Sequence, residues 1–189
     1  MSAPIEREIK LRFDTPELAR AAVERTGATR LRDRRLQEDC LLDTAEETLR
    51  LQRSVLRIRN EGHRSVLTFK GPVQPGPMKV REELETVVND GNLMLQVLER
   101  LGLHVWFRYQ KYREEFAHKD VVIAVDETPV GTFVEIEGTE HGIIAVAEAL
   151  GRGPGDYILD SYHRLFLTYR EVLGFRGHDM IFDEPDRTV

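Results

Sequence analysis

Alternating charged and apolar residues dominate the first strand that the sequence predicts, residues 5–13. Successive side chains of a strand point to opposite faces. One face of this strand therefore carries Glu6, Glu8, Lys10 and Arg12, while the other is mostly apolar. A single charged face ordinarily points at water. The same alternation, with both signs of charge, returns in strand after strand, and a closed barrel with a charged interior would require that pattern.

The composition indicates a charge-rich globular chain with an acidic balance. The 189 residues, 41% apolar and 32% charged, suffice for one domain with a sizeable core. The net charge of −6 gives no reason to expect nucleic-acid binding through a broad basic surface. The single cysteine, Cys40, excludes an intramolecular disulfide framework and suits a reducing compartment. Without a membrane-length apolar run or a signal-peptide layout, the sequence predicts a cytoplasmic protein that makes no membrane contact.

Turn and capping signals divide the chain into strands and helices. Further strands are expected at residues 31–42, 55–60, 65–70, 80–88, 104–116, 121–126 and 132–138. Helices are expected between Thr15 and Gly27 and at residues 90–101, 140–150 and 160–173. Segment 71–77, with three prolines and two glycines, is expected to be a loop. Roughly eight strands in antiparallel order predict an α+β fold in a single domain, residues 1–173, followed by a polar, loose tail, 174–189.

The charged faces of these strands carry residues of both signs. The acids are Glu6, Glu8, Glu83, Glu85, Asp126, Glu135 and Glu137, and the bases are Lys10, Arg57, Arg59, Lys70, Arg81, Lys111 and Arg113. Any one such pair is more often a solvated face or a guarded edge. Repetition across several strands favours the functional interpretation over a solvated face, because buried charges must be paired or must bind something charged. Inside a barrel of about eight strands, the bases suit phosphate oxygens and the acids suit Mg²⁺ or Mn²⁺.

Several motifs occur in the order typical of one superfamily. They are Glu6-x-Glu8-x-Lys10, Leu56-Arg57-Ile58-Arg59, Leu67-Thr68-Phe69-Lys70-Gly71-Pro72, Arg81-x-Glu83-x-Glu85, Lys111-x-Arg113, Asp126, Glu135-x-Glu137 and Ser161-Tyr162-x-x-Leu165. Through them the chain resembles the CYTH, or triphosphate tunnel metalloenzyme, superfamily over about residues 5–173. The third and the last motif are most similar to the branch named for class IV adenylate cyclases.

The resemblance implies a closed antiparallel eight-stranded barrel, or tunnel, with helices packed outside. It also implies two Mg²⁺ or Mn²⁺ ions, one clamping the phosphates and the other activating the nucleophile. The implied metal ligands are Glu6, Glu8, Glu83, Glu85, Glu135 and Glu137, with Asp126 either joining them or ordering them from behind. The implied triphosphate ligands are Lys10, Arg57, Arg59, Lys70, Arg81, Lys111 and Arg113. Lys10, Glu6 and Glu8 are the implied catalytic residues.

One position departs from the hydrolases that resemble thiamine triphosphatase. Those enzymes usually carry aromatic residues just before an Asp-Thr pair, whereas Asp43-Thr44 follows Leu41 and Leu42 here. The tyrosine that would help a lysine activate water is therefore missing at this position. The departure weighs against a thiamine triphosphatase and against Lys10 as a tyrosine-assisted base.

Three functions remain open from the sequence, each with a triphosphate as the small-molecule partner. In an adenylate cyclase, which the resemblance favours, the 3′-hydroxyl of ATP attacks the α-phosphorus and pyrophosphate leaves. In a hydrolase, water attacks a terminal phosphorus and orthophosphate leaves. A non-catalytic binding module could lose the carboxylates, and this chain keeps them. Residues that bind polyphosphate do not distinguish a cyclase from a hydrolase.

The remaining candidate residues give weaker indications. The six histidines show no metal-ligand spacing. Cys40 is expected to be a small buried residue rather than a nucleophile. Trp106 and Phe107 are expected to pack or to form dimer contacts rather than to stack a base. A homodimer is expected from the resemblance alone.

Overall fold

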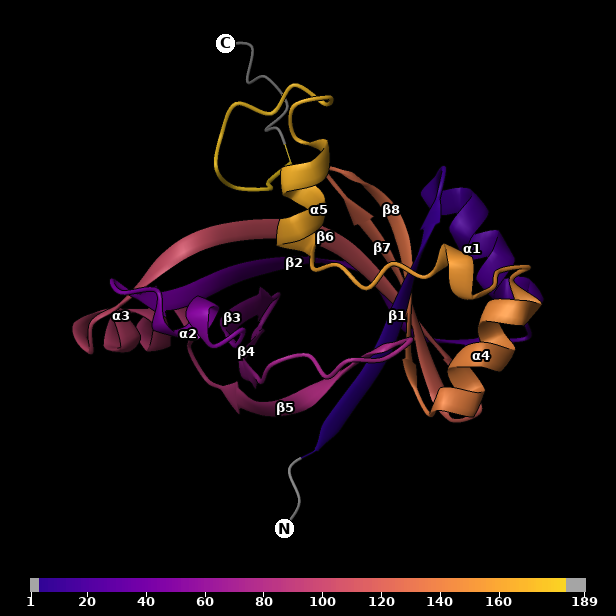
Figure 1. Ribbon diagram of the computed structural model, residues 1–189, viewed down its shortest axis with the longest axis horizontal. Coiled ribbons are helices and arrows are strands. Elements are labelled where there is room, and N and C mark those ends of the chain that lie inside the picture. Colours follow the sequence, from indigo (N-terminus) through magenta and orange to yellow (C-terminus); the bar gives the residue numbers. More distant parts are fainter. Residues whose placement is uncertain (1–3, 183–189) are drawn as a thin grey trace.

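The computed structural model describes residues 4–182 and folds them into a closed barrel (Figure 1). The strands are β1 (Ile5–Phe13), β2 (Thr29–Thr44), β3 (Val55–Glu61), β4 (Arg64–Lys70), β5 (Lys79–Val88), β6 (Leu103–His118), β7 (Val121–Thr128) and β8 (Gly131–Gly138). Around the barrel they follow the order β1-β5-β4-β3-β2-β6-β7-β8, and every neighbouring pair is antiparallel. The predicted α+β fold with an eight-stranded antiparallel barrel is confirmed.

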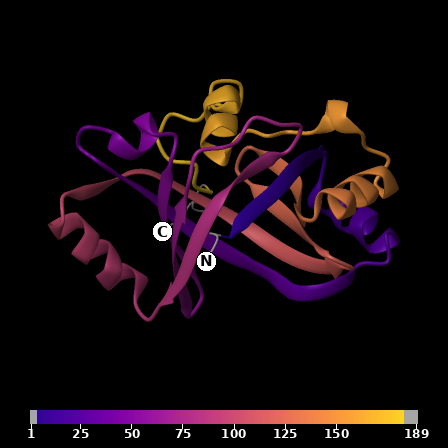
Figure 2. The same cartoon turned by 60° about the horizontal axis from the view of Figure 1, so that its bottom comes forward.

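The helices lie outside the barrel, as expected. They are α1 (Pro16–Arg25), α2 (Thr48–Leu51), α3 (Gly91–Arg100), α4 (Glu140–Ala149) and α5 (Tyr162–Tyr169). Thr15, Asp90 and Thr139 begin α1, α3 and α4 by accepting a backbone N–H bond in the first turn, which satisfies a donor that the helix leaves free. Helices α1 and α4 lie side by side against β1, β7 and β8 (Figures 1 and 2). Within residues 4–182, no helix is both long enough and apolar enough to cross a bilayer.

The main apolar core lies between the barrel wall and helices α1 and α4. Ile9 and Leu11 of β1 are completely buried there, together with Ile136 of β8 and Ile143 of α4. Each fully buried side chain of this kind contributes roughly 1.5–3 kcal/mol relative to its exposed state. The barrel is therefore stabilised on its outer face, and its inner face is left for other groups.

The C-terminal part differs from its prediction. Helix α5 ends at Tyr169 rather than at residue 173, because the chain turns at Gly174, where φ is +75°, and Phe175 N–H bonds back to Arg170. Beyond the turn, Met180 N–H donates to the carbonyl of Arg108 in β6 at 2.9 Å. Met180 is completely buried, so the predicted tail is docked rather than loose as far as residue 182. Its remaining part, 183–189, lies outside the described residues.

Candidate active site

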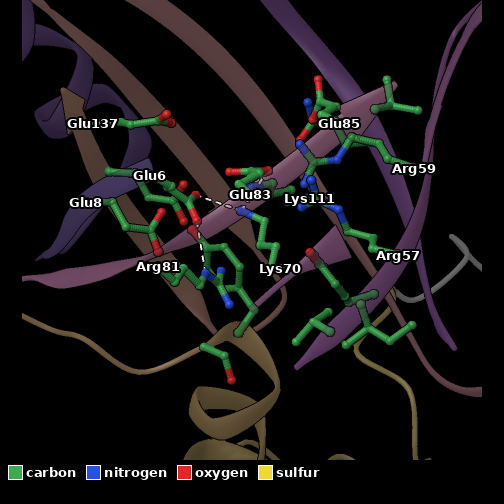
Figure 3. Close-up of a pocket in the computed structure, with 18 of the residues that line it drawn as sticks. Glu6, Glu8, Arg57, Arg59, Lys70, Arg81, Glu83, Glu85, Lys111 and Glu137 are labelled. Atoms are coloured by element: carbon green, nitrogen blue, oxygen red, sulfur yellow. Dashed lines mark hydrogen bonds and ion pairs between the residues drawn. The ribbon is translucent and has the colours of Figure 1, made fainter. Parts of the chain in front are cut away.

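The barrel encloses a cavity of about 720 Å³ whose wall carries charges of both signs (Figure 3). This volume lies in the range of small-molecule sites. Every side chain predicted to bind a triphosphate lines it, namely Lys10, Arg57, Arg59, Lys70, Arg81, Lys111 and Arg113. Glu6, Glu8, Glu83, Glu85, Glu135 and Glu137, predicted as metal ligands, line it as well. Asp126, the remaining predicted ligand, is not among the lining residues.

Strand pairing explains why residues distant in sequence meet here. β1 points Glu8 and Lys10 into the barrel, directly opposite Glu137 and Glu135 of β8. On its other side, Glu6 of β1 faces Arg81 of β5. Opposite residues on antiparallel strands have Cβ atoms about 5 Å apart, so their charged groups meet across the strands. The two-residue period of the sequence thus brings charged groups of both signs together on one wall, with Glu8 opposite another acid and Lys10 and Glu6 opposite residues of the other sign.

The first cluster of ion pairs surrounds Glu6. Its two carboxylate oxygens accept from Lys70 Nζ at 2.6 Å and from Arg81 Nε at 3.0 Å. Lys70 also reaches Glu83 at 3.1 Å. Burial and the nearby Glu8 oppose ionisation of Glu6, but Lys70 and Arg81 outweigh them and lower its pKa. Glu6 is therefore held as a carboxylate between two cations.

The second cluster contains Lys79, which the sequence reading missed. Glu8 Oε1 lies 3.0 Å from Lys10 Nζ and 2.7 Å from Lys79 Nζ, and all three side chains are buried. Burial lowers the pKa of Lys79 to about 8, and Lys10 and Arg81 add repulsion. Lys79 was missed because the predicted strand began at residue 80, whereas β5 begins at Lys79. Two-residue alternation from Arg81 would otherwise have placed Lys79 on the same inward face.

The third cluster is built around Asp126, which is completely buried. Its oxygens accept from Lys111 Nζ at 2.8 Å, from Arg113 Nε at 2.7 Å and Nη2 at 2.6 Å, and from the hydroxyl of Tyr162 at 2.6 Å. Arg113 also bonds Glu135, and Lys10 lies 3.3 Å from the same carboxylate. With these donors in place, Asp126 orients Lys111, Arg113 and α5 from behind the tunnel wall.

Arginines of β3 form the opposite wall and depend on Asp39 of β2, a second residue that sequence reading missed. Asp39 Oδ1 lies 2.8 Å from Arg59 Nε and 3.5 Å from Arg57 Nε, and Asp39 is 1% exposed. Arg57 Nη2 donates to Thr68 at 3.2 Å. Within residues 4–182, the buried Nε of Arg57 has no hydrogen-bond partner. Burying such a donor unpaired is costly, so this wall has capacity for an anionic ligand.

The tunnel has two chemically different ends. The end next to α5, called the α5 end, is lined by Leu41, Arg50, Arg53, Ser54, Val55, Trp106, Ser161 and His163. Strands β2, β3, β6 and β8 continue from there to the far end, which is lined by Arg32, Arg35, Glu61, Arg64, Glu85, Glu115 and Glu137. Figure 3 shows Glu85 and Glu137 on the side of the cavity away from the helix. Acids and their counterions therefore gather at the far end, and aromatic and hydroxyl groups gather at the α5 end.

Trp106 reaches the cavity because β6 contains an irregularity. Leu41 pairs with Phe107 and Leu42 pairs with Val105, so Trp106 has no residue opposite it. Such a bulge turns a side chain away from the direction that alternation predicts. Phe107 packs in the core at 1% exposure, and Trp106 packs against the same cluster, as expected. The side chain of Trp106 also lines the tunnel, which the sequence did not predict.

The carboxylates near the far end have the chemistry of a divalent-cation site. Partial desolvation inside the tunnel, followed by repulsion from Glu6 and Glu8, raises the pKa of Glu137 to about 7, although this side chain remains exposed to solvent. Burial also raises the pKa of Glu83, although Lys70 opposes the change. No group of three His, Cys, Asp or Glu side chains is arranged to hold an ion within the part of the chain that the structure describes. A hard cation would nevertheless relieve this repulsion, so the oxygen donors present fit Mg²⁺ or Mn²⁺.

Comparison with known proteins agrees with this architecture. Residues 4–153 match the model of the CYTH domain family. A candidate adenylate cyclase of Methanocaldococcus jannaschii is 29% identical over 134 residues, which cover 70% of this chain and 76% of the relative.

Solved structures with the same fold include two similarly named proteins. A candidate adenylate cyclase of Vibrio parahaemolyticus superposes with a TM-score of 0.78 at 19% identity, covering 88% of this chain and 99% of that one. A candidate adenylyl cyclase of Hippeastrum, described as having a dominant triphosphatase activity, superposes with a TM-score of 0.66 at 20% identity, covering 87% and 95%. Since the family model spans most of the sequence and the closed charged barrel agrees with it, the chain belongs to the CYTH domain family.

Proposed function

We propose that this protein is a metal-dependent enzyme that binds a triphosphate in its tunnel and cleaves a phosphoanhydride bond. The observation that carries the proposal is the closed cavity lined by lysines and arginines from six different strands. Four of the five lysines in the chain, Lys10, Lys70, Lys79 and Lys111, line it. Although many of these cations are paired with carboxylates, lysines and arginines outnumber the acids that line the cavity, and a triphosphate in extended form would supply the missing negative charge along the tunnel axis.

The residues of the chain divide the binding between them. Arg57 and Arg59 are oriented by Asp39, and Lys111 and Arg113 are oriented by Asp126, so each pair reaches the cavity in a fixed geometry. Arginine forks hold two phosphate oxygens and lysines act as point charges. Cations fixed before the reaction stabilise charge that moves onto the leaving phosphate without having to reorganise.

Two Mg²⁺ or Mn²⁺ ions complete the proposed site. The carboxylates that would hold them are Glu6, Glu8, Glu83, Glu85, Glu135 and Glu137. Glu83 and Glu137 fit this role best, because desolvation first, and then repulsion from neighbouring carboxylates, raise their pKa values, and a bound cation would offset both. Divalent ions neutralise phosphate charge and acidify an attacking water.

Hydrolysis of the terminal phosphate is the outcome that the geometry supports best. Glu137, whose pKa is raised to about 7, lies at the far end, and within the described residues that line the α5 end none is acidic. A substrate whose terminal phosphate points to the far end would present that phosphorus to activated water. The bond from water oxygen to phosphorus forms as the bridging P–O bond breaks, and orthophosphate and the shortened polyphosphate leave. The triphosphatase activity ascribed to the Hippeastrum protein supports this outcome.

Cyclisation of ATP is the second candidate, and the adenylate cyclase names of two relatives favour it. Here the ribose 3′-oxygen would bond to the α-phosphorus, its proton would pass to a base, and pyrophosphate would leave. Purified protein should be incubated with ATP or tripolyphosphate and Mg²⁺ or Mn²⁺, and the products resolved. We expect orthophosphate from both substrates. Formation of cyclic AMP and pyrophosphate from ATP would show that the enzyme is a cyclase rather than a hydrolase. No turnover of either substrate with either metal would overturn both candidate functions.

A further inference from the structure

We propose that the α5 end of the tunnel binds a planar heterocyclic group of the substrate against Trp106, so that the enzyme favours a nucleoside triphosphate over inorganic tripolyphosphate. The inference rests on the proposed function and names the substrate class of the same tunnel. It begins with the bulge in β6, which leaves Trp106 unpaired between Val105 and Phe107. Without this extra residue the indole would not line the cavity.

The surroundings of Trp106 form a platform of planar groups. The Arg50 guanidinium lies over one face of the indole, 4.4 Å from the ring centre, and the His163 imidazole lies 4.8 Å from the same centre, edge to face, so a base would stack on what these contacts leave uncovered. Nucleobases stack on aromatic rings and on guanidinium planes, largely regardless of which base is present. Three such groups converge here from α2, β6 and α5.

The platform is fixed in place by a buried acid. Asp43 is completely buried and accepts backbone N–H bonds from Thr44, Leu49 and Arg50 at 2.8–3.0 Å. The same carboxylate lies 3.3 Å from Arg50 Nε, and Glu47 lies 2.8 Å from the other side of the guanidinium. Because Arg50 is already ordered, a base that stacks beside it loses little conformational entropy.

The far end offers no comparable surface. Its rim consists of paired ions, in which Arg35 reaches Glu61 at 2.7 Å and Glu115 at 2.8 Å, and Arg32 reaches Glu61 at 3.2 Å. Within residues 4–182, the aromatic side chains that line the cavity are Trp106, Tyr109, Tyr162 and His163, and all lie toward the α5 end. An uncharged planar group would therefore bind beside α5, with its phosphates extending into the tunnel.

Intrinsic fluorescence gives a direct test, because Trp106 is the only tryptophan in the chain. Full-length protein should be titrated with a non-hydrolysable ATP analogue and, separately, with tripolyphosphate, and each affinity should also be measured by calorimetry. We expect quenching that saturates with the ATP analogue and a much smaller change with tripolyphosphate. Equal responses to the two ligands would overturn the inference even if no variant could be made.

Variants separate stacking from a packing role. Trp106→Ala should reduce the preference for the ATP analogue over tripolyphosphate roughly tenfold, the usual loss for one stacked base, and Trp106→Phe should restore most of it. Arg57→Met should weaken the binding of both ligands and leave the preference unchanged. Leu51→Ala, at an exposed α2 residue, should change neither the affinities nor the preference. An unchanged preference in Trp106→Ala would refute the subsite. Failure of the wild type to bind either ligand would instead refute the proposed function, and the subsite with it.

Discussion

The two faces of the barrel wall use the same strands for opposite purposes. On β1, Ile9 and Leu11 face outward and are completely buried under helices, while Glu8 and Lys10 face inward and are 5% and 2% exposed. Burying the apolar pair is favourable, whereas burying the charged pair costs free energy that only partners or a ligand can offset. The difference shows that the outer face stabilises the fold, and the cost of the buried charges is the reason that we propose a charged ligand for the inner face.

Asp126 should be the strongest exception to this division between a stabilising outer face and a binding inner face. It belongs to the inner network, yet its removal would leave Lys111 and the Tyr162 hydroxyl buried without their acceptor and would leave Arg113 with Glu135 alone. Asp126→Ala should therefore lower the free energy of unfolding by about 3–5 kcal/mol, measured by urea denaturation. Asp33→Ala, at a side chain that is 89% exposed, is the control and should change it by less than about 0.5 kcal/mol. A mild effect of Asp126→Ala would mean that the three donors find water or other acceptors.

The outer face should give the next largest effect. Ile136 is completely buried beneath the helices, and Ile136→Ala removes apolar contacts and leaves a cavity. We expect a loss of about 3 kcal/mol in the free energy of unfolding, with turnover per folded molecule unchanged. Leu84→Ala, at a β5 residue that is 46% exposed, should cost far less. Equal costs at both positions would contradict an outer face stabilised by α1 and α4.

Lys10→Ala should affect activity more than stability, the reverse of what we expect for Ile136→Ala. Without the lysine, Glu8 keeps Lys79 and Glu135 keeps Arg113, so the wall remains largely paired. Lys10→Ala should lower kcat/KM roughly a hundredfold, about 2.7 kcal/mol of transition-state stabilisation, with a smaller change in stability. Lys119→Ala, at the exposed lysine outside the tunnel, is the matched control. Unchanged kinetics in Lys10→Ala would remove this residue from the proposed site.

The inner face was predictable from sequence wherever strands are regular. On β1, β3 and β8 a strict two-residue period assigned Glu8, Arg57 and Glu135 to one face, and the structure places them in one cavity. The two-residue period of a strand shows which face a side chain is on. Only the order and register of the paired strands show which side chain on another strand lies next to it. The sequence could therefore collect the charged residues but not their pairing, such as Glu6 between Lys70 and Arg81.

Sequence reading failed where the backbone is irregular or where a boundary was misplaced. β2 shifts its register at Arg32 and Arg35, which hid the inward direction of Asp39. The bulge at Trp106 turns that side chain into the tunnel, which the alternation of β6 does not indicate. Lys79 was lost because a proline-rich loop set the predicted start of β5 one residue late. A bulge depends on the pairing of two distant strands, so no local pattern in one of them reveals it.

The smallest predicted effect tests whether the inner face is poised for a cation. Glu137 has an ordinary pKa of 4.5 and a folded-state pKa of about 7, raised by burial and by Glu6 and Glu8. An acid with a raised folded-state pKa costs no stability while protonated in both states, and its cost grows as pH rises from 4.5 to 7. Because solvent screens this exposed side chain, only a small part of the shift counts toward stability, so Glu137→Gln should melt like the wild type near pH 4.5 and roughly 2 °C higher near pH 8.

Divalent ions provide the second arm of this melting experiment. Mg²⁺ or Mn²⁺ at pH 8 should raise the melting temperature of the wild type, because a bound cation removes the repulsion among Glu6, Glu8 and Glu137. The rise should be smaller in Glu137→Gln, and Glu99→Gln, at an exposed carboxylate on α3, should behave like the wild type. If Glu137→Gln matches the wild type at pH 8 with and without metal, the acids near the far end do not repel one another. The tunnel would then bind phosphate by its cations alone, and the inner face would be built for an anion rather than for an anion with metal.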